Sequence, residues 1–426
     1  PPFLPSGARA ALALTRDTFL TRRQPPAFVR VYERSRQKAP HFSGGMNAVN
    51  RSPYLSQTPI NTIMRKAYRY RLYPSKSQTT LLEQTLEICR RVYNDTLALR
   101  KNAWEQEQRS ISLYETNKIL TQWKKQRSDL NRVHSQVLQN VQVRVDLAFK
   151  SFFRRVKAGE TPGYPRFKGK GRYDSITYKQ SGFKLDGDRL HLSKIGDVKI
   201  VLHRPVEGTI KTLTIRRSAT GKWYACFSVE YDPTPAPQKE SVVGIDVGLE
   251  SFATLSNGEK IENPRFFRTD EKALAKAQRK LSKAEKGTPE RKKARKIVAH
   301  IHERIANRRL NFAHQTSRRL VDRFGTIVFE DLNITNMQKN HHLAKSIADV
   351  AWNQFVTITT SKAEDAGSRV ILVNPRNTSQ QCSRCGMIVA KTLSDRVHSC
   401  PHCGLVMDRD QNAAINIMRL GLQSLG

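Results

Sequence analysis

The sequence predicts a multidomain α+β chain in which an N-terminal β-barrel carries a helical insertion and an α/β domain follows with a small cysteine-rich insertion. Apolar residues recur at helical spacing between about 74 and 160, and at a spacing of two between about 161 and 235. The proline-rich stretch DPTPAPQKES then separates this half from one in which short apolar strands and helical patterns alternate. The change of period and the linker together favour separate domains.

The charge of the chain indicates a polyanionic partner. Its 426 residues include 74 Lys and Arg against 37 Asp and Glu, so the formal net charge is +37. Such a field opposes compaction unless a polyanion such as nucleic acid neutralises it. A basic protein of the membrane surface is the competing class, but no apolar run approaches the ~20 residues that a membrane span needs. We therefore predict a nucleic-acid-binding protein with no membrane partner.

The cysteines favour a reducing compartment. Four of the six form two C-x-x-C pairs, which is a metal-ligand spacing rather than a secreted disulfide framework. Cys89 and Cys226 stand alone within apolar patterns, so we expect both to be buried as hydrophobic side chains. These features predict a cytoplasmic protein.

Residues 1–63 differ from the rest of the chain. They are rich in Pro, Ser and Arg, begin without Met and show no sustained period. A transit peptide would require an amphipathic helix, and none is evident in this segment. We expect a disordered basic N-terminal extension. Whether it belongs to the natural protein is left open.

The first strand is predicted at residues 64–73, where apolar and basic positions alternate. The apolar face consists of Tyr68, Tyr70 and Leu72, and the basic face of Arg69 and Arg71. We predict that these two arginines contact nucleic acid.

A helical insertion follows at 74–160. Ser75 and Gln78 have the spacing of a capping box at its start, and Gly159 and Pro162 end the last helical pattern. The strand period then returns over 161–240, with a hairpin that turns across Ala219–Lys222.

The segment TPGYPRFKGKGRYDSITYK joins the helices to these strands. It interleaves aromatic and basic side chains, namely Tyr164, Phe167, Tyr173 and Tyr178 with Arg166, Lys168, Lys170 and Arg172. The aromatic rings could stack on bases or could pack inside the protein, and the sequence does not decide between these readings. We predict nucleic-acid contacts at Arg166 and Lys168.

Acidic residues recur where predicted strands or helices end or begin. Asp246 lies within the apolar strand VVGIDV, Glu330 and Asp331 end the strand TIVFED, and Asp408 and Asp410 precede the helix NAAINIMRL. A carboxylate in a buried strand is costly without compensation. Each residue alone has a simpler explanation, as a satisfied core aspartate or a helix cap. Three such places together predict a carboxylate cluster.

A carboxylate cluster has a definite chemistry. Oxygen ligands suit hard cations, so aspartate and glutamate are the residues that would hold Mg²⁺. Two Mg²⁺ ions roughly 4 Å apart activate water and stabilise the leaving oxygen of a phosphodiester.

Five stretches, in this order, resemble the TnpB family: GIDVGLESFAT, HERIANRRLNFAHQ, VFEDLNI, NTSQQCSRCG and DRDQNAAINI. TnpB proteins are compact RNA-guided nucleases of insertion sequences, related to the type V CRISPR effectors. The resemblance covers residues 64–420 and implies a prokaryotic protein that associates with the nucleoid. It implies a wedge-like barrel, a RuvC-like domain of the RNase H type, and catalytic Asp246, Glu330 and Asp410. The family's third acid is the first residue of D-x-N-A-A, three positions before the first alanine, which selects Asp410 and leaves Asp408 as a neighbour that caps the helix or supports the site.

The four paired cysteines read C-x₂-C-x₁₄-C-x₂-C, with Cys382, Cys385, Cys400 and Cys403 as the ligands. Four thiolates suit a closed, structural Zn²⁺ site with no open position for water. A redox C-x-x-C or a chance arrangement is the alternative. Nearby His398 and His402 are left out because four sulfurs already complete the coordination. We predict that zinc braces the chain between the second and third acids.

The segment 291–314 has a helical pattern with a strongly basic face. Its apolar positions are Ile297, Ile301, Ile305 and Leu310, and its basic positions include Arg291, Lys292, Arg295, Arg304, Arg308 and Arg309. A solvated basic face is the simplest explanation. The segment also resembles the family's basic helices that contact the guide–target duplex, so we predict nucleic-acid contacts at Arg304 and Arg308.

The sequence therefore predicts an RNA-guided DNA endonuclease that cuts beside a short adjacent motif by two-metal hydrolysis. Its partners would be a guide RNA from the transposon end and double-stranded target DNA. Alternatives are a strand-transferring transposase and a non-cutting zinc-ribbon regulator of DNA.

The expected parts of the chain follow one another in sequence. They are the extension 1–63, the first barrel strand 64–73, the helical recognition insertion 74–160, the rest of the barrel 161–240, the nuclease domain 241–381, the zinc ribbon 382–403, and the last nuclease motif with the C-terminal helix 404–426.

Overall fold

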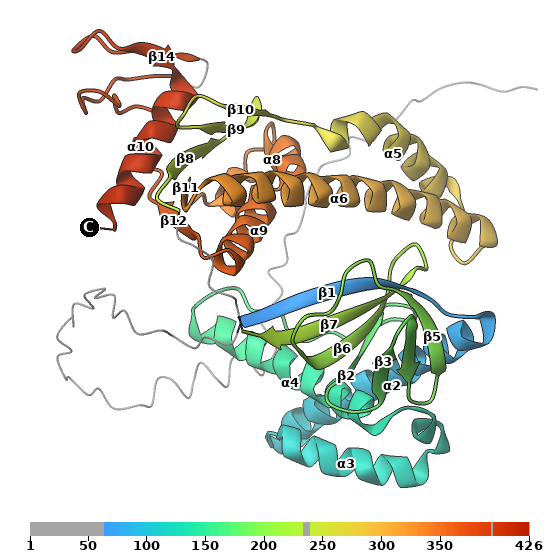
Figure 1. The fold of residues 1–426 in the computed structure, drawn as a ribbon. Coiled ribbons are helices and arrows are strands. Elements are labelled where there is room, and N and C mark those ends of the chain that lie inside the picture. Colours follow the sequence, from blue (N-terminus) through green and yellow to red (C-terminus); the bar gives the residue numbers. More distant parts are fainter. Residues whose placement is uncertain (1–63, 233–238, 393–394, 426) are drawn as a thin grey trace, which may run out of the picture. The chain divides into compact units, whose positions relative to one another are not determined.

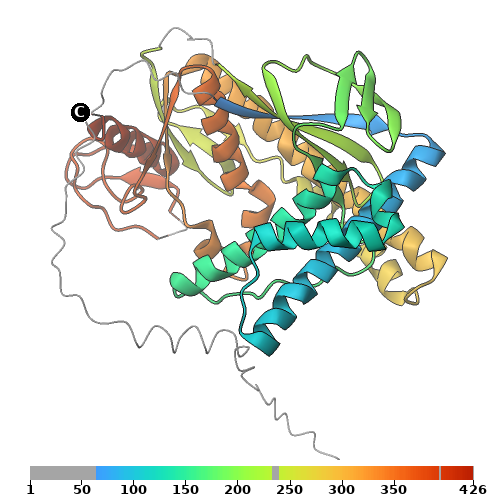
Figure 2. The same cartoon turned by 90° about the horizontal axis from the view of Figure 1, so that it is seen from below.

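A computed structural model describes residues 64–232, 239–392 and 395–425 (Figures 1 and 2). The expected N-terminal extension 1–63 and part of the linker lie outside these residues. The chain forms two compact units. The described part of the first unit consists of Ser75–Lys184 and His191–Asp197. The second contains the chain up to Pro74, Leu185–Leu190 and everything from Val198 onward.

The first unit is mainly helical, as the sequence predicts for the insertion. Its helices are α2 (Lys76–Glu107), α3 (Leu113–Gln126), the 3₁₀ turn η1 (Ser128–Arg132) and α4 (Ser135–Lys157). The predicted capping box is confirmed: the Ser75 side chain accepts from the Gln78 backbone, and the Gln78 side chain accepts from the Ser75 backbone. Apolar residues of α2 and α4 pack together in the core, which includes Leu86, Cys89, Val141 and Phe149.

A seven-stranded sheet has the order β2-β6-β7-β1-β5-β4-β3. Its strands are β1 (Met64–Tyr73), β2 (Ser175–Tyr178), β3 (Phe183–Asp186), β4 (Arg189–Leu192), β5 (Gly196–Val201), β6 (Thr209–Arg217) and β7 (Trp223–Tyr231). Strand β1 pairs antiparallel with β7 and β5, and β6 with β7. Tyr68, Tyr70 and Leu72 are buried, as predicted for the apolar face of β1. Among the described residues the predicted barrel is not closed by strand pairing, because β2 and β3 end the order.

The second half of the chain builds a mixed five-stranded sheet with the order β10-β9-β8-β11-β12. Its strands are β8 (Val242–Val247), β9 (Ser251–Leu255), β10 (Lys260–Glu262), β11 (Thr326–Glu330) and β12 (Arg369–Val373). Strands β8, β9 and β10 are antiparallel neighbours, whereas β11 runs parallel to both β8 and β12. The carboxyl ends of β8, β11 and β12 therefore meet at one edge of the sheet.

Helices cover both faces of this sheet (Figure 1). The helices of this half are α5 (Phe266–Lys283), α6 (Pro289–Arg323), α7 (Ile334–Met337), α8 (Ala344–Val350), α9 (Trp352–Asp365) and α10 (Arg409–Gln423). One face packs against α6 and α9 in a core that includes Ile245, Phe329, Leu320 and Phe355. The other face packs against α10 through Val328, Val373 and Ile417. A short hairpin of β13 (Val397–Ser399) and β14 (Val406–Asp408) precedes α10.

Glycine allows α10 to approach the sheet closely. A Cβ added at Gly244 of β8 would lie 2.1 Å from the carbonyl oxygen of Ala414 and 2.5 Å from the amide nitrogen of Met418. A Cβ at Gly421 would lie 2.4 Å from Val328 of β11. No side chain larger than hydrogen fits at either contact, so these two glycines set the position of α10 on the sheet.

Two burial predictions need correction. Ile297, expected on the apolar face of the basic helix, is 46% exposed, whereas Ile305 is buried. Ile297 lies in the half of the 35-residue helix α6 that precedes the sheet contacts of Ala313 and Leu320, so little of the chain covers it. Cys226 is only partly buried because it alternates with the buried Ala225 and Phe227 on β7 and so faces away from the core. No helix in the described ranges is both long and apolar enough to span a bilayer.

Candidate functional site

Asp246 and Glu330 lie side by side on neighbouring parallel strands. The paired residues of β8 and β11 end with Ile245 opposite Phe329, and each acid is the next residue of its strand. Because side chains alternate along a strand, Asp246 shares the face of Gly244 and Glu330 shares the face of Val328. That face is the one covered by α10. Two of the predicted acids are thus brought together under this helix.

Asp410 stands in the first turn of α10, near enough for its charge to act on Asp246. Asp408 caps this helix, since its carboxylate accepts hydrogen bonds from the backbone of Asp410 and Gln411, both at 3.0 Å. Lys260 pairs with Asp408 at 2.6 Å. Of the two roles left open for Asp408, the structure shows the helix cap, and Asp410 does not have that role. Its Oδ1 instead accepts two bonds from the Arg409 guanidinium, both at 3.0 Å.

The acids influence one another electrostatically. Burial raises the pKa of Asp246 well above its ordinary value, and the charges of Glu330 and Asp410 raise it further. Burial also raises the pKa of Glu330, against the opposing effect of a hydrogen bond from Thr378. Burial also opposes ionisation of Asp408, but the bond and charge of Lys260 and the backbone bonds from Gln411 and Asp410 together outweigh it and lower the pKa of that carboxyl. Carboxylates that disfavour each other's ionisation form a site that a cation would stabilise.

Thr378 connects Glu330 to α10 and to the cysteine segment. This buried hydroxyl donates to Glu330 Oε1 and also contacts the Pro375 carbonyl at 3.1 Å. The Thr378 carbonyl accepts from the Asn416 amide at 2.9 Å, and the same amide reaches the Gln381 carbonyl at 2.7 Å. A continuous set of hydrogen bonds thus runs from α10 to the second acid.

Asn412 makes the next connection, to the first cysteine pair. Its Nδ2 donates to the Gln381 carbonyl at 2.8 Å, and its Oδ1 accepts from the Ser383 amide at 2.9 Å. Ser383 stands between the ligands Cys382 and Cys385. The metal-site segment is therefore fastened directly to the helix that carries Asp410.

The four predicted zinc ligands are gathered at one point. The Sγ atoms of Cys382 and Cys403 lie 3.6 Å apart, as do those of Cys385 and Cys400, and all four lie within 4.8 Å of one another. Tetrahedral zinc with bonds of about 2.3 Å to sulfur separates its ligands by about 3.8 Å, so the cluster has the size that zinc requires.

The chemistry of the cysteine cluster also suits a metal. Although burial opposes it, hydrogen bonds from the Cys385 and Arg384 backbone and from the His398 and Cys403 side chains lower the pKa of Cys382 to about 5, while hydrogen bonds among the thiols raise the pKa of Cys403. His398 is buried with Nδ1 against Lys391, outside the ligand group, as predicted. Within the described ranges the cysteines are the only group of three or more potential ligands close enough to share one ion.

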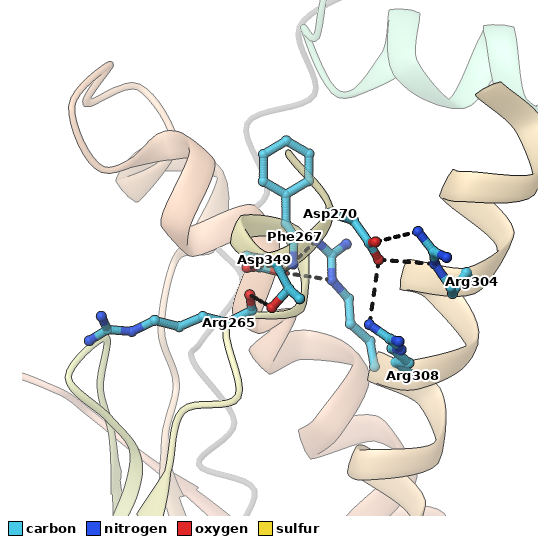
Figure 3. A network of polar contacts seen from close by, with 8 residues as sticks. Arg265, Phe267, Asp270, Arg304, Arg308 and Asp349 are labelled. Carbon is cyan, nitrogen blue, oxygen red and sulfur yellow. Dashed lines mark hydrogen bonds and ion pairs between the residues drawn. The ribbon is translucent and has the colours of Figure 1, made fainter. Parts of the chain in front are cut away.

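Arg304 and Arg308 are engaged within the protein (Figure 3). Both pair with Asp270 of α5, which is buried, and Arg308 does so at 3.5 Å. Arg309 pairs in the same way with the buried Asp349 of α8, at 2.6 Å. These ion pairs fasten α6 to α5 and α8. Arg304 and Arg308 remain nearly half exposed, at 49% and 45% of their side chains, and their contact with nucleic acid stays a prediction.

Arg69 and Arg71 lie over the ring of Tyr224, at 5.1 and 5.2 Å from its centroid. Stacking of this kind orders the guanidinium groups without neutralising their charge. Both arginines therefore remain able to bind phosphate, and that role stays a prediction.

The basic–aromatic segment before β2 is held by α2. The Asn94 side chain donates to the Lys168 carbonyl at 3.0 Å and accepts from the Lys168 amide at 2.8 Å. Tyr173 and Tyr178 are buried, so they pack rather than stack on bases, whereas Phe167 is 52% exposed. Of the two readings, packing inside the protein applies to Tyr173 and Tyr178, whereas stacking on a base stays open for Phe167. Arg166 is exposed and Lys168 partly so.

Sequence reasoning missed several residues of this region: Gly244, Thr378, Asn412 and Asn416 on the site, and Asp270 and Asp349 in the arginine network. A signal existed for the asparagines, because two amides four residues apart in an apolar helix face the same side and must find partners when buried. For Asp270 and Asp349 there was none, since the sequence does not indicate which of its many charged residues are buried.

Comparison with known proteins identifies the family of this chain. A protein of Streptomyces pristinaespiralis named "Putative RNA-guided DNA endonuclease" is 38% identical over 367 residues, which cover 84% of this chain and 90% of that protein. Residues 226–341 match the OrfB IS605 family model described as a probable transposase. The chain belongs to the TnpB family.

Other TnpB-related proteins extend the comparison. The InsQ protein of Escherichia coli K12, with the same kind of name, is 31% identical over 84% of this chain and 92% of its own length. Residues 352–417 match a Cas12f1-like TNB domain. Residues 64–109 match a model described as a helix-turn-helix domain, although they form strand β1 and the single helix α2 here. The cryo-EM structure of a Cas12f1–sgRNA–target DNA complex aligns with a TM-score of 0.53 at 14% identity, covering 84% of this chain and 99% of that one, which shows a shared mixed α/β fold.

Proposed function

We propose that this TnpB-family chain is an RNA-guided endonuclease that hydrolyses target DNA at Asp246, Glu330 and Asp410, in a RuvC-like domain built on the β10-β9-β8-β11-β12 sheet. The observation that carries the proposal is the adjacency of Asp246 and Glu330 at the carboxyl ends of β8 and β11, with Asp410 at the start of the helix that covers them. Relatives named as RNA-guided DNA endonucleases support the reaction.

The three carboxylates would hold Mg²⁺, most simply two ions, and their oxygen ligands fit that cation. When bound, the ions supply an activated water and stabilise the leaving oxygen of the phosphodiester. Arg409 competes with a cation for Asp410, because one carboxylate oxygen already accepts two of its N–H groups. Thr378 holds Glu330 in place, and the Asp408 cap holds the first turn of α10.

The cysteine site fits Zn²⁺ and would act structurally. Residues 382–403 would form the zinc ribbon, within a nuclease half that spans 241–426. Residues 64–240 would hold the guide RNA and read the short adjacent motif, with the helical insertion 74–160 as the recognition part. The charge of +37 favours such polyanionic partners. Guide RNA would come from the transposon end, and the protein would act on the DNA of a prokaryotic cytoplasm.

The test is to express the chain with its flanking genomic DNA, purify it in high salt and sequence the retained nucleic acid. One dominant RNA ending in a variable segment, followed by cutting of DNA that matches that segment, is expected. Heterogeneous fragments, or none, would contradict guidance by RNA and favour a DNA-binding regulator. Joined products that require transposon ends would favour a strand-transferring transposase, whereas a nuclease leaves free ends.

A further inference from the structure

A cavity opens beside the carboxyl end of β8. It has a volume of ≈ 590 Å³ and is lined by the loop that follows this strand, the turn before α5, helix α8 and the segment before β13. Leu249 and Glu250 form one wall, and Leu249 is only three residues beyond Asp246. In a sheet of this type, ligands bind in the crevice outside the carboxyl ends of the strands. None of the three acids lines the cavity, but it opens at the edge of the sheet where β8 and β11 end with Asp246 and Glu330, within reach of a strand that is bound at these acids.

The charged side chains that line the cavity differ in whether they have an ion-pair partner. Asp349 in its wall is already paired with Arg309, at 2.6 Å, and accepts the Phe267 amide at 3.0 Å. Arg268 pairs with Glu271 at 3.1 Å, and Arg396 with Glu250 at 3.2 Å, across exposed surface where such pairs are weak. Arg265 has no side-chain partner within the described part of the chain.

Neighbouring residues hold Arg265 in an uncommon backbone conformation. Its φ of 46° is left-handed, which is uncommon for a residue other than glycine. Asn263 holds this conformation, since its Oδ1 accepts from the Arg265 amide at 3.1 Å while its Nδ2 donates to the Leu249 carbonyl at 2.7 Å. Figure 3 shows the Arg265 side chain extending away from Asp270 and its arginine partners. Residues that their neighbours hold in this region of φ cluster at ligand-binding sites, and the Arg265 side chain is exposed and so accessible to a ligand.

A phosphodiester is the ligand that suits these features. The planar guanidinium binds phosphate through paired N–H donors. The cavity falls within the ~300–1,000 Å³ of small-molecule pockets, which is room for one or two nucleotides of a single strand and not for a duplex.

We propose that this cavity binds the sugar–phosphate backbone of the single DNA strand being cut, and that Arg265 is its main phosphate ligand. The proposal rests on the nuclease function proposed above. It adds the substrate contact: Arg265 binds a phosphate flanking the scissile bond, and the pairs of Arg268 and Arg396 open to bind the phosphates beyond it.

The test uses the full chain with its guide RNA and target strands in which one phosphate at a time near the cut is replaced by a neutral methylphosphonate. For the wild type, single-turnover cleavage should fall about tenfold or more at one phosphate, the scale of a lost hydrogen bond to a charged group. Arg265→Ala should cut the ordinary strand more slowly by a similar factor and show no further loss at that phosphate. The cleavage rate of Arg265→Lys should lie between those of the wild type and Arg265→Ala, because lysine keeps the charge but lacks the paired N–H donors of the guanidinium.

Arg279→Ala is the matched control, because Arg279 is an exposed arginine of the helix that follows Arg265, outside the cavity. It should cut like the wild type and keep the full methylphosphonate effect. Zinc content and melting temperature are measured for the Arg265 variants to check that they fold like the wild type. If Arg265→Ala cuts as fast as Arg279→Ala, or keeps the methylphosphonate effect, the cavity assignment is wrong while the nuclease function stands. A wild type that cuts no guided target overturns both.

Discussion

Asp246 and Glu330 are neighbours across β8 and β11, one position beyond the paired residues Ile245 and Phe329, on the face that α10 covers. The backbones of adjacent strands lie about 4.8 Å apart, which is close to the roughly 4 Å between the two cations of a two-metal site. Their segments are separated by helices α5 and α6 in sequence. Parallel pairing of two short strands is what brings them together.

The first prediction concerns the acids themselves. Asp246→Asn and Glu330→Gln should each reduce guided cleavage by roughly 10⁴-fold or more, the scale seen when an essential catalytic group is removed. Both side chains keep their size, so the retained RNA and target binding should persist. Single-turnover cleavage and an RNA co-purification assay measure the two effects. Undiminished cutting by either variant would refute the assignment.

The second prediction concerns pH. Because the pKa of Asp246 is raised in the folded chain, this residue stabilises the fold below its unfolded pKa of about 4, and that stability is lost as the pH rises through the folded pKa. The amide of the Asp246→Asn variant cannot ionise. In magnesium-free buffer, the melting temperature of this variant minus that of the wild type should therefore increase as the pH rises from about 4. The difference should become constant above the folded pKa of Asp246. A difference that stays constant across the pH series would contradict the raised pKa.

Thr378 provides the third prediction, because its hydroxyl donates to Glu330. Thr378→Val keeps the shape and removes the donor, so we expect a loss of roughly 10–100-fold in cleavage, as for other groups that orient a metal ligand. The Mg²⁺ concentration for half-maximal cutting should also rise, while zinc content stays normal. Thr378→Ser should restore most of the activity. Equal activity of the Val and Ser variants would show that the hydroxyl does not position Glu330.

The fourth prediction tests how α10 is placed. Gly244→Ala forces a Cβ against the backbone of Ala414, which cannot yield as a side chain would. Overpacking of this kind costs about 1–3 kcal/mol in the free energy of unfolding, and the shift of α10 should also lower cleavage. Gly169→Ala is the control, since an added Cβ there meets nothing closer than 3.9 Å. Chemical denaturation of both variants measures the difference, and equal stabilities would show that α10 is not held at Gly244.

The fifth prediction concerns zinc. Cys382→Ser, or removal of zinc by a chelator, should lower metal content and melting temperature first, because a structural zinc site contributes directly to folding. Cleavage should fall as a consequence, through the bonds that join Ser383 to Asn412 and Thr378 to Glu330. Metal analysis, melting and cleavage on the same samples establish the order. Loss of cutting with normal zinc and normal melting would contradict a purely structural site.

Much of this chain could be predicted from local pattern. The alternation in β1, the capping box at Ser75, the hairpin near residue 220 and the two cysteine pairs all depend on residues close in sequence, and the structure has each of them. The acids could be placed on strand and helix ends for the same reason. What periodicity could not reveal was the partner of each charged group, as the engagement of Arg304 and Arg308 with Asp270 demonstrates.

The sequence by itself determined the types and spacings of the functional residues: four thiols suited to zinc, three acids suited to magnesium and a large positive charge. Only the tertiary structure decided which of them meet and which charges remain available. It set Asp246 beside Glu330, fastened Thr378 and Asn416 to the site, paired Arg304 internally and, among the described residues, left Arg265 without a side-chain partner. The physical reason is that spacing in sequence governs local geometry, whereas neutralisation of a charge depends on segments that only packing brings within hydrogen-bond distance.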